Sequence, residues 1–122
     1  MSRYAYVPDP ENDAVQSVID ELTSPLTRAV LRQLTTHGGL MSGQLALATG
    51  AHQQSVLHVL GRLERHGLVR ADQPREARQG RRVRYSADVE KVDRMLATLR
   101  RYLLAPEPVA APRGPVQVPA TA

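Results

Sequence analysis

Residues 42–69, with the sequence SGQLALATGAHQQSVLHVLGRLERHGLV, decide the fold of this chain. Ser42 can cap a short helix, and Gly50 ends it where a left-handed backbone is needed. A second helix is expected over residues 52–66, with Gly67 as its C-terminal stop. The stretch therefore predicts two short helices joined by a tight turn.

The helix at 52–66 has two chemically different faces when each residue advances by about 100°. Val56, Val59, Leu60 and Leu63 fall together and predict a buried stripe. The opposite side carries amide, imidazole and guanidinium groups, which can pair with the edges of bases in the major groove. A solvated polar face is the alternative. The outward residues are Gln54, His58, Gly61 and Arg65, with Leu57 at the edge.

A basic hairpin follows, which we call the wing (residues 70–86). Leu68-Val69-Arg70-Ala71 predicts one strand, residues 72–80 a charged loop, and the alternation over residues 81–86 a second, half-exposed strand. Four Arg lie within residues 78–84, more than protection of a strand edge requires. Such a ribbon is suited to phosphates or to a narrow minor groove.

Amphipathic helices flank this unit. Asp9 or Asn12 can cap a first helix, Ser24-Pro25 begins a second, and a last helix starts near Asp88. The apolar stripes of the first and last helices are wider than a small core can cover, so we expect them to form a dimer interface. Packing within one monomer is the alternative. The interface residues expected are Val15, Val18, Ile19, Leu22, Val92, Met95, Leu96, Leu99, Tyr102 and Leu103.

The predicted fold is mainly α with a small β-hairpin. It is a winged helix-turn-helix of about five helices and a two-stranded wing. Residues 1–10 are expected to form an irregular arm, residues 11–104 the domain, and residues 105–122, which hold five Pro, a disordered tail.

Composition excludes several classes of function. The 122 residues contain no Cys, so disulfides, thiolate metal sites and Cys nucleophiles are ruled out. The sequence has no membrane-length apolar run and no signal-peptide pattern at Met1-Ser2-Arg3, which predicts a cytoplasmic protein. The formal net charge is +4, yet residues 1–21 sum to −4 and residues 62–84 to +5. A local basic segment is typical of nucleic-acid binders.

The chain from about Leu22 to Leu104 resembles the ArsR-type winged-helix regulators. The opening helix LTSPLTRAVLRQL (22–34), the helix pair at 45–69 and the wing sequence RQGRRVRY (78–85) carry this resemblance in the family's order. MarR-type regulators share the core and rank second. The resemblance implies a homodimer that binds operator DNA, usually as a repressor released by an effector.

The chain departs from the metal-sensing members of that family. It lacks their Cys, and its last helix holds Asp88, Glu90 and Asp93 but no His. The four His have no i, i+4 pair of the kind that a helical zinc site would use. We therefore expect no metal and no other cofactor, and any effector is unidentified. The His residues are His37, His52, His58 and His66.

The sequence thus predicts a dimeric DNA-binding transcriptional regulator and not an enzyme, because no catalytic triad, carboxylate dyad or phosphate-binding glycine loop is evident. A protein-binding winged helix and a sequence-independent architectural DNA binder are the alternatives. The expected partners are double-stranded DNA and a second copy of the chain, with no membrane. The expected DNA-contacting residues are Gln53, Gln54, Ser55, His58, Arg62, Arg65, Arg78, Arg81, Arg82 and Arg84.

Overall fold

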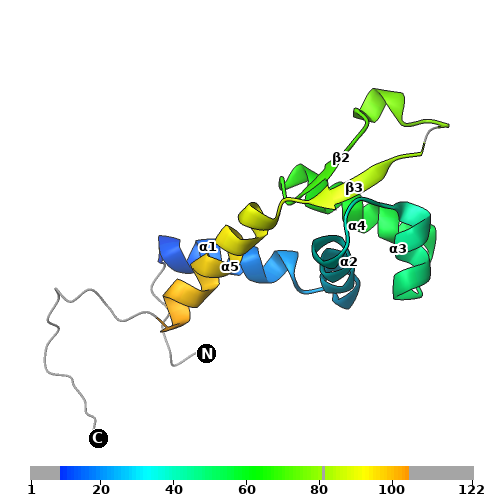
Figure 1. Ribbon diagram of the computed structural model, residues 1–122. Coiled ribbons are helices and arrows are strands. Elements are labelled where there is room, and N and C mark those ends of the chain that lie inside the picture. The colour runs from blue at the N-terminus through cyan, green and yellow to red at the C-terminus, as the bar shows by residue number, and fades with distance from the viewer. Residues whose placement is uncertain (1–8, 81, 105–122) are drawn as a thin grey trace, which may run out of the picture.

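The computed structural model describes residues 9–80 and 82–104 (Figure 1). The expected tail (105–122) lies outside the described residues, and so does the expected arm (1–10) apart from its last two residues. The described part holds five α-helices, as expected. They are α1 (Pro10–Glu21), α2 (Pro25–Thr36), α3 (Ser42–Thr49), α4 (Gln53–Arg65) and α5 (Val89–Leu104).

Three helices begin at side-chain caps in the places that the sequence predicts. Asp9 Oδ1 accepts a hydrogen bond from the N–H of Glu11 (3.0 Å), which starts α1 one residue earlier than expected. Ser24 Oγ accepts from the N–H groups two and three residues later, at 3.1 and 3.3 Å. Asp88 Oδ1 accepts from the N–H three residues later, at 3.1 Å. These bonds satisfy N–H groups that a helix leaves without partners.

The start of α3 differs from the prediction. Ser42 does not cap the helix, because it is already the first helical residue. Instead, Gln44 Oε1 accepts from the N–H of Met41 at 2.8 Å, reaching back over the first turn. The hydroxyl of Ser42 accepts from Gln53 Nε2 at 2.8 Å, and this bond ties the start of α3 to the start of α4.

The two expected strands of the wing are present, and a third strand that was not expected joins them in one sheet. The strands β1 (Leu40–Met41), β2 (Val69–Ala71) and β3 (Arg84–Ala87) are antiparallel in the order β1-β3-β2. A strand of two residues is too short to show alternation in the sequence. It forms because the chain before α3 passes beside β3, where Leu40 pairs with Tyr85.

The second wing strand begins at Arg84 rather than at Arg81. Asp72 closes the ladder there: its N–H donates to the Arg84 carbonyl, and its Oδ1 accepts from the Arg84 N–H, both at 3.0 Å. The loop between the strands contains a 3₁₀ turn, η1 (Arg75–Ala77). Tyr85 is buried in the core, as the alternation predicts.

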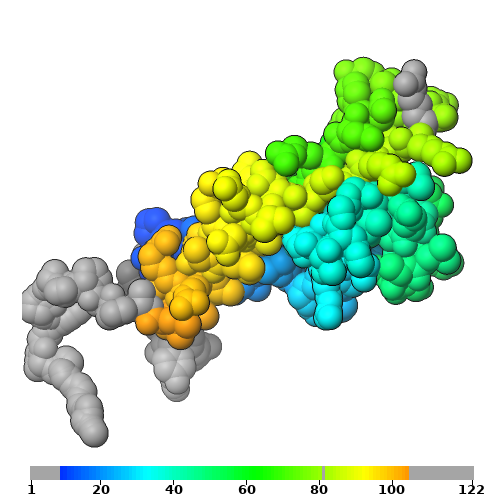
Figure 2. Space-filling model, viewed as in Figure 1, coloured from blue at the N-terminus to red at the C-terminus, as the bar shows by residue number. Residues whose placement is uncertain are grey.

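The main core lies where α2, α3 and α4 meet the inner face of the sheet. The predicted stripe of α4 is buried there: Val56, Val59, Leu60 and Leu63 are all at most 6% exposed. In Figure 1, α1 and α5 lie side by side at one end of an elongated molecule, and the loop of the wing projects at the other. Figure 2 shows that the wing loop rises above α3 and α4.

Candidate nucleic-acid interface

The outer face of α4 presents polar side chains to solvent. Gln53, Gln54 and Ser55 in its first turn are exposed, and so is His58 one turn later. The opposite stripe is buried, so these groups cannot turn inward without unpacking the core. Gln53 also bonds to Ser42, which fixes its amide at the junction of α3 and α4.

A groove of about 630 Å³ separates α4 from the wing. Leu57 and Gly61 line it on the side of α4, while Arg75 and Arg82 line it on the side of the wing. A Cβ placed on Gly61 would meet only the end of the Arg65 side chain, at 3.9 Å. The glycine therefore leaves a low point on α4 where another molecule can approach the backbone.

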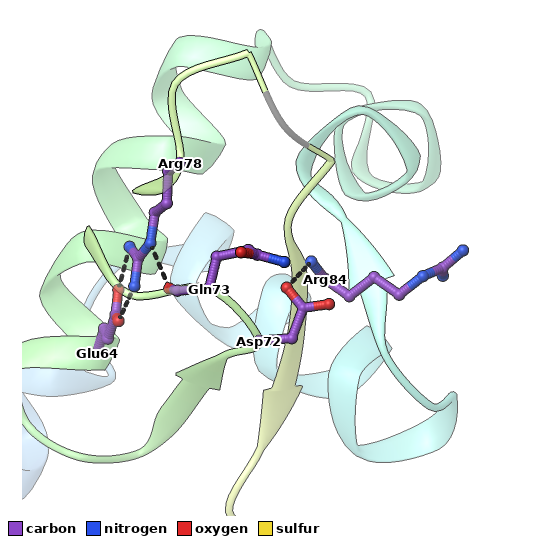
Figure 3. A network of polar contacts seen from close by, with 5 residues as sticks. All are labelled: Glu64, Asp72, Gln73, Arg78 and Arg84. Carbon is purple, nitrogen blue, oxygen red and sulfur yellow. Dashed lines mark hydrogen bonds and ion pairs between the residues drawn. The ribbon is translucent and has the colours of Figure 1, made fainter. Parts of the chain in front are cut away.

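Two of the residues that line this groove, Glu64 and Arg78, form an ion pair. Figure 3 shows the pair from close by. Arg78 Nη1 and Nη2 donate to Glu64 Oε1 and Oε2 at 3.0 and 2.6 Å, and its Nε donates to the Gln73 carbonyl at 2.8 Å. Both charged side chains are only about one-fifth exposed. The hydrogen bond from Arg78 lowers the pKa of Glu64, and the same bond raises the pKa of Arg78.

This geometry changes the role expected for Arg78. Its guanidinium is engaged on three N–H groups within the protein, so it is poorly placed to contact a phosphate. The Arg78 side chain instead connects the loop of the wing to α4. Burial raises the pKa of the Tyr85 phenol, which lies near the same two charged groups.

The other expected arginines have different surroundings. Arg65 and Arg82 are exposed, whereas Arg81 lies outside the described residues. In Figure 3, the Arg84 side chain points away from Glu64, and its Nη1 donates to the Gly39 carbonyl at 3.2 Å. Arg62 is half-buried, with its Nη2 3.9 Å from Glu21 Oε2, so it points toward α1.

The residues expected at a dimer interface divide into two groups. Val15 and Val18 are buried within the chain, where α1 packs against α5. Ile19, Leu96, Tyr102 and Leu103 are between 37% and 64% exposed, and Leu22, Val92, Met95 and Leu99 are intermediate. Within the described part of the chain, no residue of α5 is buried, although the helix is amphipathic over sixteen residues.

The sequence analysis missed the acidic residues that organise this region. Glu64 and Asp72 each hold part of the wing, and Glu21 Oε2 lies 2.8 Å from His66 Nε2. The sequence did carry one sign of this role for two of them. Glu64 and Asp72 are two of only three acidic residues within the basic segment 62–84. An acidic residue that stands among eight Arg is a candidate to form an ion pair with one of them.

Two further observations bear on the kind of site. Among residues 9–80 and 82–104, no three His, Asp or Glu side chains gather as metal ligands would. No helix in the same ranges is long and apolar enough to cross a membrane.

The chain matches no protein-family model and no curated protein, but it is similar to solved structures. The antimony-specific transcriptional repressor AntR is 26% identical, with a TM-score of 0.57 over 80% of this chain and 83% of that one. The homodimeric DNA-binding domain of Mb0332 from Mycobacterium bovis, a possible ArsR-family regulator, is 25% identical, with a TM-score of 0.55 over 81% and 89%.

A MarR-family transcription regulator, SP03579, is 20% identical, with a TM-score of 0.50 over 79% of this chain and 62% of that one. The expected fold is therefore confirmed: this is a winged helix-turn-helix. The chain resembles ArsR-type regulators, with MarR-type regulators as a second group. These structural neighbours are transcriptional regulators.

Proposed function

We propose that this protein is a dimeric, sequence-specific DNA-binding transcriptional regulator that acts as a repressor. The observation that carries the proposal is the exposed polar face of α4 beside a basic wing that Glu64 and Arg78 hold in place. A helix of this width fits the major groove, and a ribbon beside it can follow the backbone.

The exposed side chains suggest a division of roles. Gln54, Ser55 and His58 contact base edges, and Gln53 joins them through the amide oxygen that its bond to Ser42 leaves available. The cationic residues Arg65, Arg81, Arg82 and Arg84 contact phosphates or the minor groove. Arg62 and Arg78 act indirectly, because each faces a carboxylate of the protein: Arg62 orients the end of α4 and Arg78 orients the wing.

The second copy is proposed to cover the exposed side of α5. Leu96 and Leu103 there are 42% and 64% exposed, and Ile19 of α1, the helix that packs against α5, is 44% exposed. The DNA-binding domain of Mb0332 is homodimeric, which agrees with this assembly. A two-fold dimer would place its two copies of α4 on half-sites roughly 34–36 Å apart.

Fluorescence anisotropy with a labelled duplex tests the proposal. The duplex comes from the region upstream of the protein's own gene, and a scrambled duplex of equal composition serves as the control, each over a salt series. We expect about a thousandfold tighter binding to the native duplex. With about eight phosphate contacts per dimer, log Kd should change with log salt with a slope near 7 in magnitude.

The two alternatives give different results in the same experiment. Equal, salt-sensitive binding to both duplexes would favour a sequence-independent architectural protein. Binding to neither duplex at low salt would favour a protein-interaction module and would contradict the proposal.

A further inference from the structure

A buried carboxylate oxygen lies without a partner at the junction of α1, α4 and α5. Glu21 is 8% exposed, and within the described ranges its Oε1 has no hydrogen-bond partner. Its Oε2 is occupied by His66 Nε2 at 2.8 Å. A buried acceptor with no donor is rare and is unfavourable by about 1–3 kcal/mol, so the Glu21 carboxylate would gain from a further cationic partner.

Glu21 lines a cavity of about 350 Å³, within the size range of small-molecule sites. Val18 of α1, Leu68 after α4 and Met95 of α5 supply an apolar surface to it. This surface suits methylene groups rather than a bare ion.

Two cations line the same cavity. Lys91 and Arg94 come from the first turns of α5, and neither forms an ion pair with any residue in the ranges 9–80 and 82–104. The Lys91 Nζ sits close over Gly67, 2.5 Å from where a Cβ would be, so the missing side chain gives the ammonium its place. The cavity therefore combines an acceptor, an apolar surface and two cations.

We propose that this cavity binds a small amphipathic zwitterion, an organic molecule with an ammonium group and a carboxylate separated by methylenes. The ammonium would pair with the Glu21 carboxylate, the methylenes would cover Met95, and the carboxylate would pair with Lys91 and Arg94. A bound ligand would contact α1, α5 and the residues that follow α4 at once. The proposal is independent of DNA binding.

The methionine methyl groups provide a direct test in the full-length protein. Met95 lines this cavity, and Met41 lines the separate groove beside the wing, so Met41 is an internal control. The probe is 6-aminohexanoate, titrated to about 20 mM against ¹³C-methyl-Met protein without DNA, a range that covers weak millimolar binding. We expect saturable shifts of the Met95 methyl, with Met41 unchanged.

Two truncated probes and two variants identify the contacts. Hexylamine and hexanoate each lack one charged end, so each should bind at least about tenfold more weakly. Glu21→Gln should weaken binding of 6-aminohexanoate by a similar factor, whereas Asp20→Asn, at an exposed neighbour that does not line the cavity, should not. Arg94→Gln, an exposed position where folding is not at stake, should also weaken it.

Four results would overturn the proposal. These are an unchanged Met95 signal over the whole titration, equal shifts of Met41 and Met95, equal binding of hexanoate, or full binding by both Glu21→Gln and Arg94→Gln.

Discussion

Glu64 of α4 and Arg78 of the wing loop form an ion pair with two parallel hydrogen bonds, 3.0 and 2.6 Å long. The planar guanidinium fits the carboxylate in one orientation only, so the pair sets direction as well as distance. Because the wing loop otherwise projects from the body, this pair decides where its basic residues stand relative to α4 (Figure 3).

Removing either partner should destabilise the fold and misplace the wing. We expect Glu64→Gln and Arg78→Gln each to lower the free energy of unfolding by about 1–2 kcal/mol, as measured by urea denaturation. The double variant should lose much less than the sum, because both changes break one interaction. Arg70→Gln is the matched control: Arg70 is 70% exposed and 3.7 Å from Asp88, so its loss should matter little. Additive losses would show that the pair contributes nothing.

The ion pair should also make the free energy of unfolding depend on pH. The pKa of Glu64 lies below 4.5 in the folded chain because Arg78 bonds to its charged form. A depressed carboxyl pKa stabilises the fold above the unfolded value, and that contribution is lost as pH falls through the folded pKa. The stability difference between the wild type and Glu64→Gln should therefore be full at pH 7 and shrink below about pH 4.5. A difference that stays constant down to pH 3 would contradict this origin.

Substitution of a phosphate-contacting residue and of a base-contacting residue should affect DNA binding in different ways. Arg82→Ala in both copies removes two exposed charges, so binding to all duplexes should weaken and the salt slope should fall by about 2. Gln54→Ala should instead lower the preference for the native duplex by about 1–3 kcal/mol with little change in slope. Anisotropy over a salt series measures both. If Arg82→Ala left the slope unchanged, the wing would not touch the backbone.

The exposed apolar side of α5 should be required for the dimer. Leu103→Glu places a charge at a position that is 64% exposed in one copy, so the monomer should fold normally but fail to associate. Sedimentation velocity measures the change. Leu47→Glu is the control, because Leu47 is 87% exposed on α3, away from α5. A dimer that survives Leu103→Glu would place the interface elsewhere.

Two glycines with a left-handed backbone differ in the space around them, so their alanine variants distinguish backbone strain from steric crowding. Gly50 and Gly67 have φ of 75° and 76°, so alanine at either should lower stability by about 1 kcal/mol. Nothing lies within 4 Å of a Cβ at Gly50, whereas at Gly67 the Lys91 Nζ lies 2.5 Å away. The end of a Lys side chain can move aside at little cost, so thermal unfolding should show similar losses for the two variants. A clearly larger loss for Gly67→Ala that Lys91→Ala relieves would show instead that the ammonium is held in place.

The helices could be predicted because their signals are local. Asp9, Ser24 and Asp88 precede apolar repeats at helical spacing, and each caps the helix that was expected after it. The buried stripe of α4 followed from the same periodicity. Strand β1 could not be predicted, since two residues show no period and its pairing partner lies more than forty residues away.

The sequence by itself determined the order of helices, the buried face of α4 and the basic character of the wing, since these depend on neighbours within a few residues. Only the tertiary structure decided what each charged side chain does. Among the arginines of the basic segment 62–84, Arg78 faces Glu64, Arg62 faces Glu21 and Arg82 faces solvent. An arginine's partner depends on which distant carboxylate the packed core brings within reach, and no local pattern encodes that distance.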